Sequence, residues 1–133
     1  MIPDFDDDGY LPPGVHPTDM EEFSSRFGHQ SEIRRAQAES VRWLVDIARR
    51  AGVLRLIVNG SFVTDVLEPN DVDCVLLIDE DFPNDSDAES ELLAGLPFLE
   101  IQLVQKQAFA VLVEEVFATD RLQRPKGMVE VLR

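Results

Sequence analysis

Apolar and polar residues alternate along this chain with two different periods, which separate helical segments from extended ones. A helical period runs through residues 31–51, where Ser31 and Gly52 are suited to cap the two ends. The apolar stripe of this segment consists of Ile33, Ala36, Val41, Leu44, Ala48 and Ala51. The pattern predicts one long helix that packs this stripe into the core.

The chain before this helix contains a short helix and an arm rich in proline. Thr18-Asp19-Met20-Glu21 resembles a capping box, and it predicts a helix that ends near Gly28. Residues 1–17 contain four prolines, which favour an extended or loop-like arm.

Extended periods dominate the second half of the chain. Strands are expected at residues 53–58, 71–79, 111–118 and 128–132, and a short helix at residues 90–95. Residues 98–104 fit either a helix or a strand. The mixture predicts a single α+β (α/β) domain over residues 1–133, with a small mixed sheet flanked by helices.

Composition narrows the class of protein. The chain is 44% hydrophobic and 29% charged, which is typical of a soluble globular domain. No apolar run is long enough to span a bilayer, and the single cysteine, Cys74, fits a reducing compartment. We therefore expect a cytoplasmic protein that does not associate with membranes.

The charge is strongly acidic but unevenly distributed. A net charge of −14 disfavours long nucleic acids as partners, because their phosphates would be repelled. Five of the twelve basic residues nevertheless lie in the predicted long helix: Arg34, Arg35, Arg42, Arg49 and Arg50. This helix either docks an acidic partner or neutralises the acidic surface of the chain itself, and the second interpretation is favoured.

The candidate chemistry lies in Gly60-Ser61 and, nine residues later, Asp71-Val72-Asp73. A glycine after a strand lets the backbone approach a phosphate, and the neighbouring serine offers donors. Asp71 and Asp73 are two residues apart in an expected strand, so they project from the same face. Carboxylates held this close favour a divalent cation between them.

This combination of residues resembles the signature of the polymerase-beta-like nucleotidyltransferase superfamily in its minimal form. Further stretches, spread over most of the chain, are similar to small bacterial members of that group. They are Ile2-Pro3-Asp4-Phe5-Asp6, Leu11-Pro12-Pro13-Gly14-Val15-His16-Pro17, Val58-Asn59-Gly60-Ser61-Phe62-Val63-Thr64-Asp65, Glu68-Pro69-Asn70-Asp71-Val72-Asp73 and Pro125-Lys126-Gly127-Met128-Val129-Glu130-Val131.

The resemblance implies a nucleotidyltransferase fold and a defined set of site residues. Gly60 and Ser61 would hold the β- and γ-phosphates of a nucleoside triphosphate such as ATP. Asp71 and Asp73 would bind two Mg²⁺ ions, with Mn²⁺ as the alternative metal. Active members of the superfamily carry a third carboxylate on a neighbouring strand, where it acts as metal ligand and general base.

The third carboxylate is ambiguous in this sequence. One alignment of residues 111–118 gives Glu114 this catalytic and metal-binding place, and a shift by one residue gives it to Glu115. A third alignment places Leu112 there and removes the carboxylate. Arg121, Arg124 and Lys126 are candidate cations for the triphosphate.

Two functions remain open at this point. The first is a Mg²⁺-dependent nucleotidyltransferase that moves a nucleoside monophosphate onto a hydroxyl of a protein, an RNA or a small molecule. The resemblance suggests a protein partner, as in a toxin–antitoxin pair. The alternative is a catalytically degenerate protein of the same fold that acts as a nucleotide- or protein-binding module.

Overall fold

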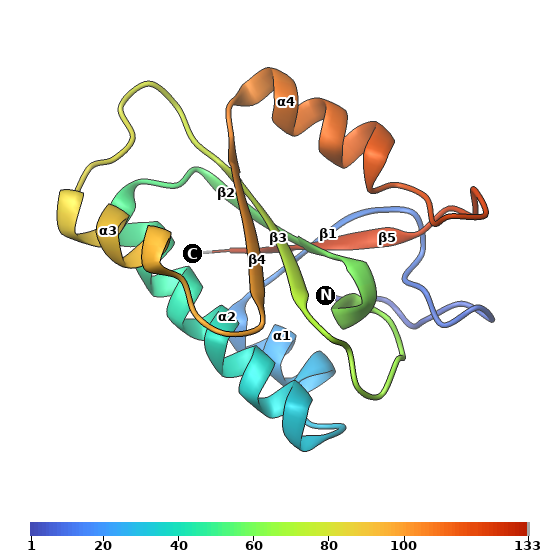
Figure 1. The fold of residues 1–133 in the computed structure, drawn as a ribbon. Helices are drawn as coiled ribbons and strands as arrows, with labels where there is room; N and C mark the ends of the chain where they lie inside the picture. The colour runs from blue at the N-terminus through green and yellow to red at the C-terminus, as the bar shows by residue number, and fades with distance from the viewer. Residues whose placement is uncertain (133) are drawn as a thin grey trace.

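A five-stranded mixed sheet forms the centre of the computed structural model, which describes residues 1–132 (Figure 1). The strand order is β1-β5-β2-β3-β4. The strands are β1 (Gly14–Thr18), β2 (Arg55–Asn59), β3 (Val72–Leu77), β4 (Leu99–Val104) and β5 (Gly127–Val131). The helices are α1 (Met20–Phe27), α2 (Glu32–Ala51), α3 (Ser86–Ala94) and α4 (Lys106–Val111), with the 3₁₀ turn η1 (Gly60–Val63) and the π-helical turn η2 (Leu112–Val116). The α+β expectation is confirmed.

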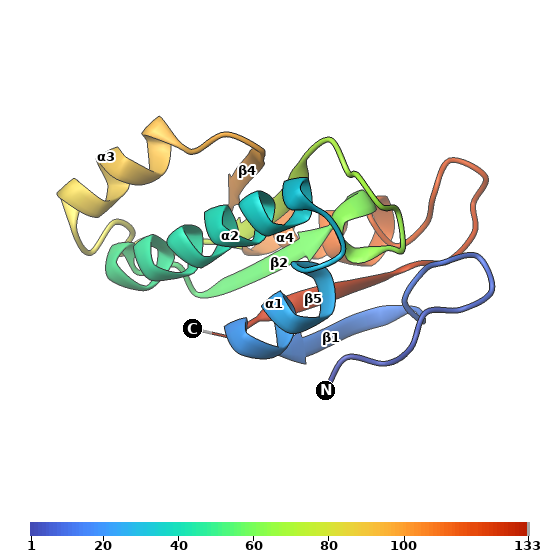
Figure 2. The same cartoon turned by 90° about the horizontal axis from the view of Figure 1, so that it is seen from below.

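Helices cover both faces of the sheet, as the two views in Figures 1 and 2 show. One face packs against α1, α2 and α3 in a core that includes Phe23, Leu44 and Val58. The opposite face packs against α4 and η2 in a smaller core of Ile57, Val75, Phe109, Val113 and Met128. Alternate residues of each strand therefore contribute to different cores.

The helix ends follow the expected capping chemistry, with one shift. The side chain of Ser31 accepts a hydrogen bond from the backbone N–H of Arg34, and Gly52 ends α2 in a left-handed conformation. The N-cap of α1 is Asp19, which accepts from the N–H of Glu22. Thr18, the expected cap, instead ends β1, because the end of the arm is an extended strand paired in parallel with β5.

The prediction of a strand at residues 111–118 is wrong. Residues 106–116 continue as α4 and η2, and Phe109 and Val113, four positions apart, bury their side chains against the sheet. Helical spacing of these apolar residues outweighs the local preference for strand. Residues 98–104, whose sequence fits either a helix or a strand, form strand β4 over Leu99–Val104. This strand, and not residues 111–118, is the neighbour of β3.

The buried face of α2 also differs from the expected stripe in its first half. Ile33 is only half-buried and Ala36 is exposed, whereas Arg34 and Gln37 are buried. Arg34 donates hydrogen bonds to the carbonyl oxygens of Phe27, Ser61, Phe62, Thr64 and Val66. A buried guanidinium is tolerated here because carbonyl oxygens accept its N–H groups.

Arg34 belongs to a row of polar residues spaced three apart on α2. Ser31 Oγ donates to Leu67 O at 2.9 Å, and Gln37 Nε2 donates to Pro69 O at 2.7 Å. Ser40 Oγ donates to Pro97 O at 3.3 Å. We call Ser31, Arg34, Gln37 and Ser40 the polar row of α2. Each of these side chains donates to a backbone carbonyl oxygen outside the helix, so α2 holds the loop at residues 61–69 and the turn before β4.

The exposed arginines of α2 neutralise the protein's own carboxylates. Arg42 pairs with Glu21 at 3.0 Å, Arg49 with Asp46 at 2.7 Å and Arg50 with Glu91 at 3.1 Å. This agrees with the interpretation of the basic helix favoured from the sequence. Within residues 1–132, no helix combines the length and the hydropathy required to cross a bilayer.

Replacing Arg34 by methionine tests the importance of this buried charge. Arg34→Met leaves several buried carbonyl oxygens without a donor, so we expect a loss of about 3–5 kcal/mol in the free energy of unfolding, measured by urea denaturation. The matched control is Arg35→Met on the exposed side of the same helix, which should change stability by about 0.5 kcal/mol or less. Equal losses in the two variants would contradict the role assigned to Arg34.

Candidate functional site

The strand register gathers polar side chains at one end of the sheet. Asn59 on β2 is the cross-strand partner of Asp73 on β3, and Asp73 is in turn the partner of Glu100 on β4. Directly paired residues on adjacent strands project from the same face. Asn59, Asp73 and Glu100 therefore form a row across three strands, which we call the carboxyl row. It lies on the face that carries α4, because Ile57 and Val75 of the α4 core lie two residues away on the same strands.

The electrostatics of Asp73 distinguish it from an ordinary surface carboxylate. Burial raises its pKa to about 6, and hydrogen bonding to Glu100 adds to this effect. The negative charges of Glu100 and Asp71 raise the pKa further. Two carboxyl groups in contact cannot both ionise without cost, so Asp73 keeps its proton to a higher pH than an ordinary aspartate does.

Gly60 fits closely against Asp73 and could not be another residue without displacing it. Its φ of 78° lies in the left-handed region. A Cβ at this position would lie 2.2 Å from Asp73 Oδ2. The structure thus brings together the Gly-Ser turn and the Asp-x-Asp segment that the sequence indicated.

Ser61 follows Gly60 in η1, and its backbone is fixed. Its carbonyl oxygen accepts from the backbone N–H of Thr64 at 3.2 Å and from Thr64 Oγ1 at 2.7 Å. It also accepts from Arg34 Nη2 at 3.5 Å. All of these bonds involve the carbonyl oxygen of Ser61, and none involves its hydroxyl.

Lys126 supplies positive charge to the carboxyl row. It is the positive charge whose field lowers the pKa of Asp73, against the effects of burial and of the neighbouring carboxylates. Its backbone N–H donates to Ala118 O at 2.9 Å, and the next N–H, of Gly127, donates to Leu11 O at 3.0 Å. The position of Lys126 therefore depends on the chain segment before it and on the N-terminal arm.

A cluster around Asp120 holds that segment to the arm. Tyr10 donates to Asp120 Oδ2 at 2.8 Å, and Arg124 Nε donates to the same oxygen at 2.7 Å. These bonds, together with the backbone N–H groups of Leu122 and Arg124, outweigh desolvation and hold the pKa of Asp120 well below its usual range. Arg124 thus has a structural role. Of the three candidate cations, Lys126 is the one whose charge acts on Asp73.

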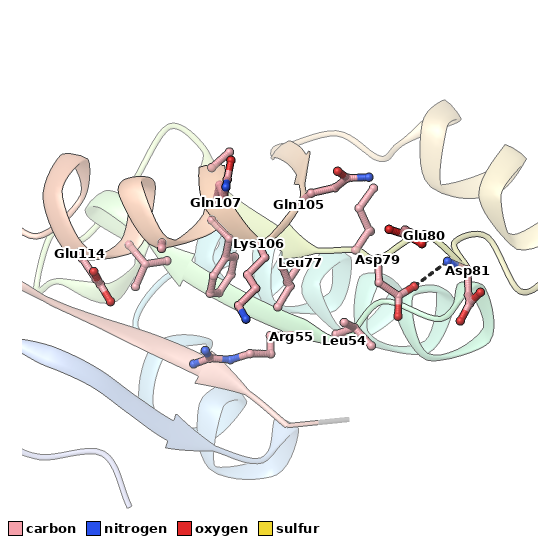
Figure 3. A pocket seen from close by; sticks show the side chains of 15 residues that line it. Leu54, Arg55, Leu77, Asp79, Glu80, Asp81, Gln105, Lys106, Gln107 and Glu114 are labelled. Atoms are coloured by element: carbon pink, nitrogen blue, oxygen red, sulfur yellow. Dashed lines mark hydrogen bonds between the residues drawn. The ribbon is translucent and has the colours of Figure 1, made fainter.

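Glu114, the expected third carboxylate, lies elsewhere. It belongs to η2 and lines a cavity of about 860 Å³, together with Arg55, Lys106 and the acidic residues Asp79, Glu80 and Asp81 (Figure 3). The described residues that line this cavity include neither Asp71 nor Asp73. Glu114 and Glu115 lose the neighbouring-strand position because their segment is helical, and Glu100 occupies it instead.

Divalent-cation binding can be tested against these observations. No three His, Cys, Asp or Glu side chains of the described chain are arranged as a ready-made metal site. Asp71 and Glu100 are nevertheless close enough to Asp73 for their negative charges to raise its pKa. A divalent cation relieves repulsion of this kind, and carboxylate oxygens are the ligands that Mg²⁺ prefers.

Two members of the carboxyl row were missed from the sequence. Leu99, Ile101 and Leu103 alternate with Glu100 and Gln102, and this period of two was the signal for a strand. Asn59 was interpreted only as the end of a strand. Its partner across the sheet depends on the register, which a sequence does not show.

The raised pKa of Asp73 predicts a dependence of stability on pH. The folded pKa of about 6 exceeds the ordinary value of about 4. The protonated carboxyl therefore stabilises the fold fully below about pH 4, and this contribution is lost as the pH rises through about 6. Asp73→Asn stays neutral, so its melting temperature should match the wild type near pH 4 and exceed it at pH 7. A difference in melting temperature that does not change with pH would contradict this assignment.

Comparison with known proteins identifies a family for this chain, but it assigns no activity to it. No curated protein and no solved structure gives a significant match to the chain. The model of a family of unknown function, DUF6932, matches residues 3–132, which is nearly the whole length. The chain therefore belongs to the DUF6932 family.

Proposed function

We propose that this protein is a Mg²⁺-dependent nucleotidyltransferase that transfers a nucleoside monophosphate from a nucleoside triphosphate to a hydroxyl group. The observation that carries the proposal is the contact of Asp73 with both Gly60 and Glu100. It joins a glycine turn, an Asp-x-Asp pair and a third carboxylate from the adjacent parallel strand. This combination is the one implied by the resemblance to the polymerase-beta-like superfamily.

The triphosphate would bind at the end of the sheet where the Gly60-Ser61 turn and the positive charge of Lys126 lie close to Asp73. Gly60 offers an approach without a side chain, Ser61 offers its hydroxyl, and Lys126 brings a positive charge to the same end of the sheet. This charge matters more than usual in a chain of net charge −14, which otherwise repels a polyanion.

Asp71, Asp73 and Glu100 would hold the divalent cations. When bound, Mg²⁺ supplies charge neutralisation of the triphosphate and activation of the attacking hydroxyl. Asp73 must first give up its proton. Its pKa of about 6 means that this proton leaves readily at neutral pH.

Glu100 is the group we assign to proton transfer. It is more exposed than Asp73, so an acceptor hydroxyl can reach it. The hydroxyl oxygen forms a bond to the α-phosphorus while the bond from that phosphorus to the bridging oxygen breaks. Pyrophosphate leaves, and the proton of the hydroxyl passes to the Glu100 carboxylate.

The acidic surface restricts the acceptor. A hydroxyl on a protein or a small molecule fits the charge of the chain better than one on a long RNA. A protein acceptor would be consistent with a toxin–antitoxin pair, in which the modified protein is the partner. We propose that the reaction takes place in the cytoplasm.

Labelled nucleotides test the activity directly. With Mg²⁺ and α-labelled ATP, GTP, CTP or UTP, we expect pyrophosphate release or label transfer for one nucleotide, and loss of both in Asp71→Asn and Asp73→Asn. An acceptor-independent readout is a rise in melting temperature with that nucleotide and Mg²⁺. If no nucleotide raises the melting temperature, the proposal fails. Binding without transfer, even with candidate partners, would favour the degenerate binding module.

A comparison of two glutamates tests which carboxylate completes the site. Glu100→Gln removes the proposed base and should lower the transfer rate by about 100-fold or more. The matched change Glu114→Gln, in the separate cavity, should leave the rate within about two-fold of wild type, the range expected when no interaction with the transition state is lost. The opposite result would return the third position to Glu114.

A further inference from the structure

Asn59 carries one of two buried side-chain atoms that lack a hydrogen-bond partner in the described chain. The two atoms are Asn59 Nδ2 and Gln37 Oε1. Asn59 is 2% exposed. Native proteins satisfy almost all buried polar groups, so each exception calls for an explanation.

The position of Asn59 links it to the candidate site. It is the last residue of β2, immediately precedes Gly60, and is paired in register with Asp73. Paired residues have Cβ atoms about 4.5–5.5 Å apart. Asparagine and aspartate side chains span this distance with one hydrogen bond from an amide N–H to a carboxylate oxygen.

The orientation of the Asp73 side chain leaves this bond unformed. Asp73 contacts Glu100, and its Oδ2 lies against Gly60. Asn59 Nδ2 is therefore an unused donor in register with a carboxyl group that has acceptor sites to spare. An apolar residue of similar size would fill the site without an unsatisfied donor, so packing alone does not account for an asparagine here.

We propose that Asn59 is a positioning residue for Asp73, an inference that rests on the proposed function. With a divalent cation held by Asp73 and Glu100, Asp73 would accept a hydrogen bond from Asn59 Nδ2, its partner across the sheet. One carboxylate oxygen is then fixed by Asn59, and the other faces the cation. Hydrogen bonds of this kind orient metal ligands, and their loss typically weakens metal binding about 10- to 100-fold.

Mn²⁺ binding, followed by electron paramagnetic resonance of the free ion, tests this role without requiring an acceptor. Titrations are made on the full chain, with circular dichroism to verify folding. Asn59→Leu removes the donor at similar volume and should weaken Mn²⁺ about 10-fold or more. The control is Thr18→Val, which removes a buried hydroxyl donor at similar volume from the end of β1, where the Thr18 hydroxyl bonds only α1 and its N-cap. This control should alter the melting temperature while leaving Mn²⁺ affinity within about two-fold, because Thr18 neither contacts nor positions a proposed ligand.

Asn59→Ser and Asn59→Ala provide a second comparison if Asn59→Leu does not fold. They are close in size, but only serine keeps a donor, so Asn59→Ser should bind Mn²⁺ more tightly than Asn59→Ala. Equal affinities in this pair would overturn the role of Asn59, as would equal weakening by Asn59→Leu and Thr18→Val. Wild-type affinity in Asn59→Leu overturns the role of Asn59 alone. Failure of the wild-type protein to bind both Mn²⁺ and nucleotide overturns the proposed function itself.

Discussion

The buried guanidinium of Arg34 is the constraint on which the geometry of the site depends. It is 2% exposed, and within residues 1–132 it forms no ion pair. Backbone carbonyl oxygens between Phe27 and Val66 accept its N–H groups instead. Burial lowers the pKa of Arg34 and the charge of Asp65 raises it, but an arginine keeps its proton under such conditions. The charge can be accommodated only if the loop after β2 keeps its conformation.

The polar row of α2 extends this constraint to the chain segments next to Gly60, Asp71 and Glu100. Arg34 holds the loop that begins at Gly60, Gln37 holds Pro69 two residues before Asp71, and Ser40 holds Pro97 three residues before Glu100. One rigid helix thus fixes two connections, the loop between β2 and β3 and the turn before β4. Loops positioned by a rigid scaffold are where binding and catalytic groups usually lie. Here the scaffold and the site are on opposite faces of the same sheet.

The carboxyl row concentrates negative charge that is partly removed from solvent. Asp73 is partly buried beside Glu100 and Asp71, and its pKa rises until a proton is retained near pH 6. Lys126 opposes this shift from the segment that Asp120 ties to the N-terminal arm. A carboxyl group perturbed by burial and by charged neighbours is more typical of a functional site than of an ordinary surface. The N-terminal arm and the turn at residues 119–125 therefore bear on the electrostatics of a distant strand.

Local chemistry in the sequence determined the capped helix α2, the strands β2, β3 and β5, and the association of Gly60 and Ser61 with Asp71 and Asp73. These features depend on spacing within one segment, which period and capping residues reveal. The partners across the sheet depended on register and on the packing of α4. Apolar spacing at Phe109 and Val113 made residues 106–116 helical, which removed Glu114 from a strand and left β4 with Glu100 beside Asp73. The sequence by itself identified Gly60, Ser61, Asp71 and Asp73 as candidate groups, while only the tertiary structure placed Glu100 and Asn59 beside Asp73, because contacts between strands join residues that are far apart in the chain.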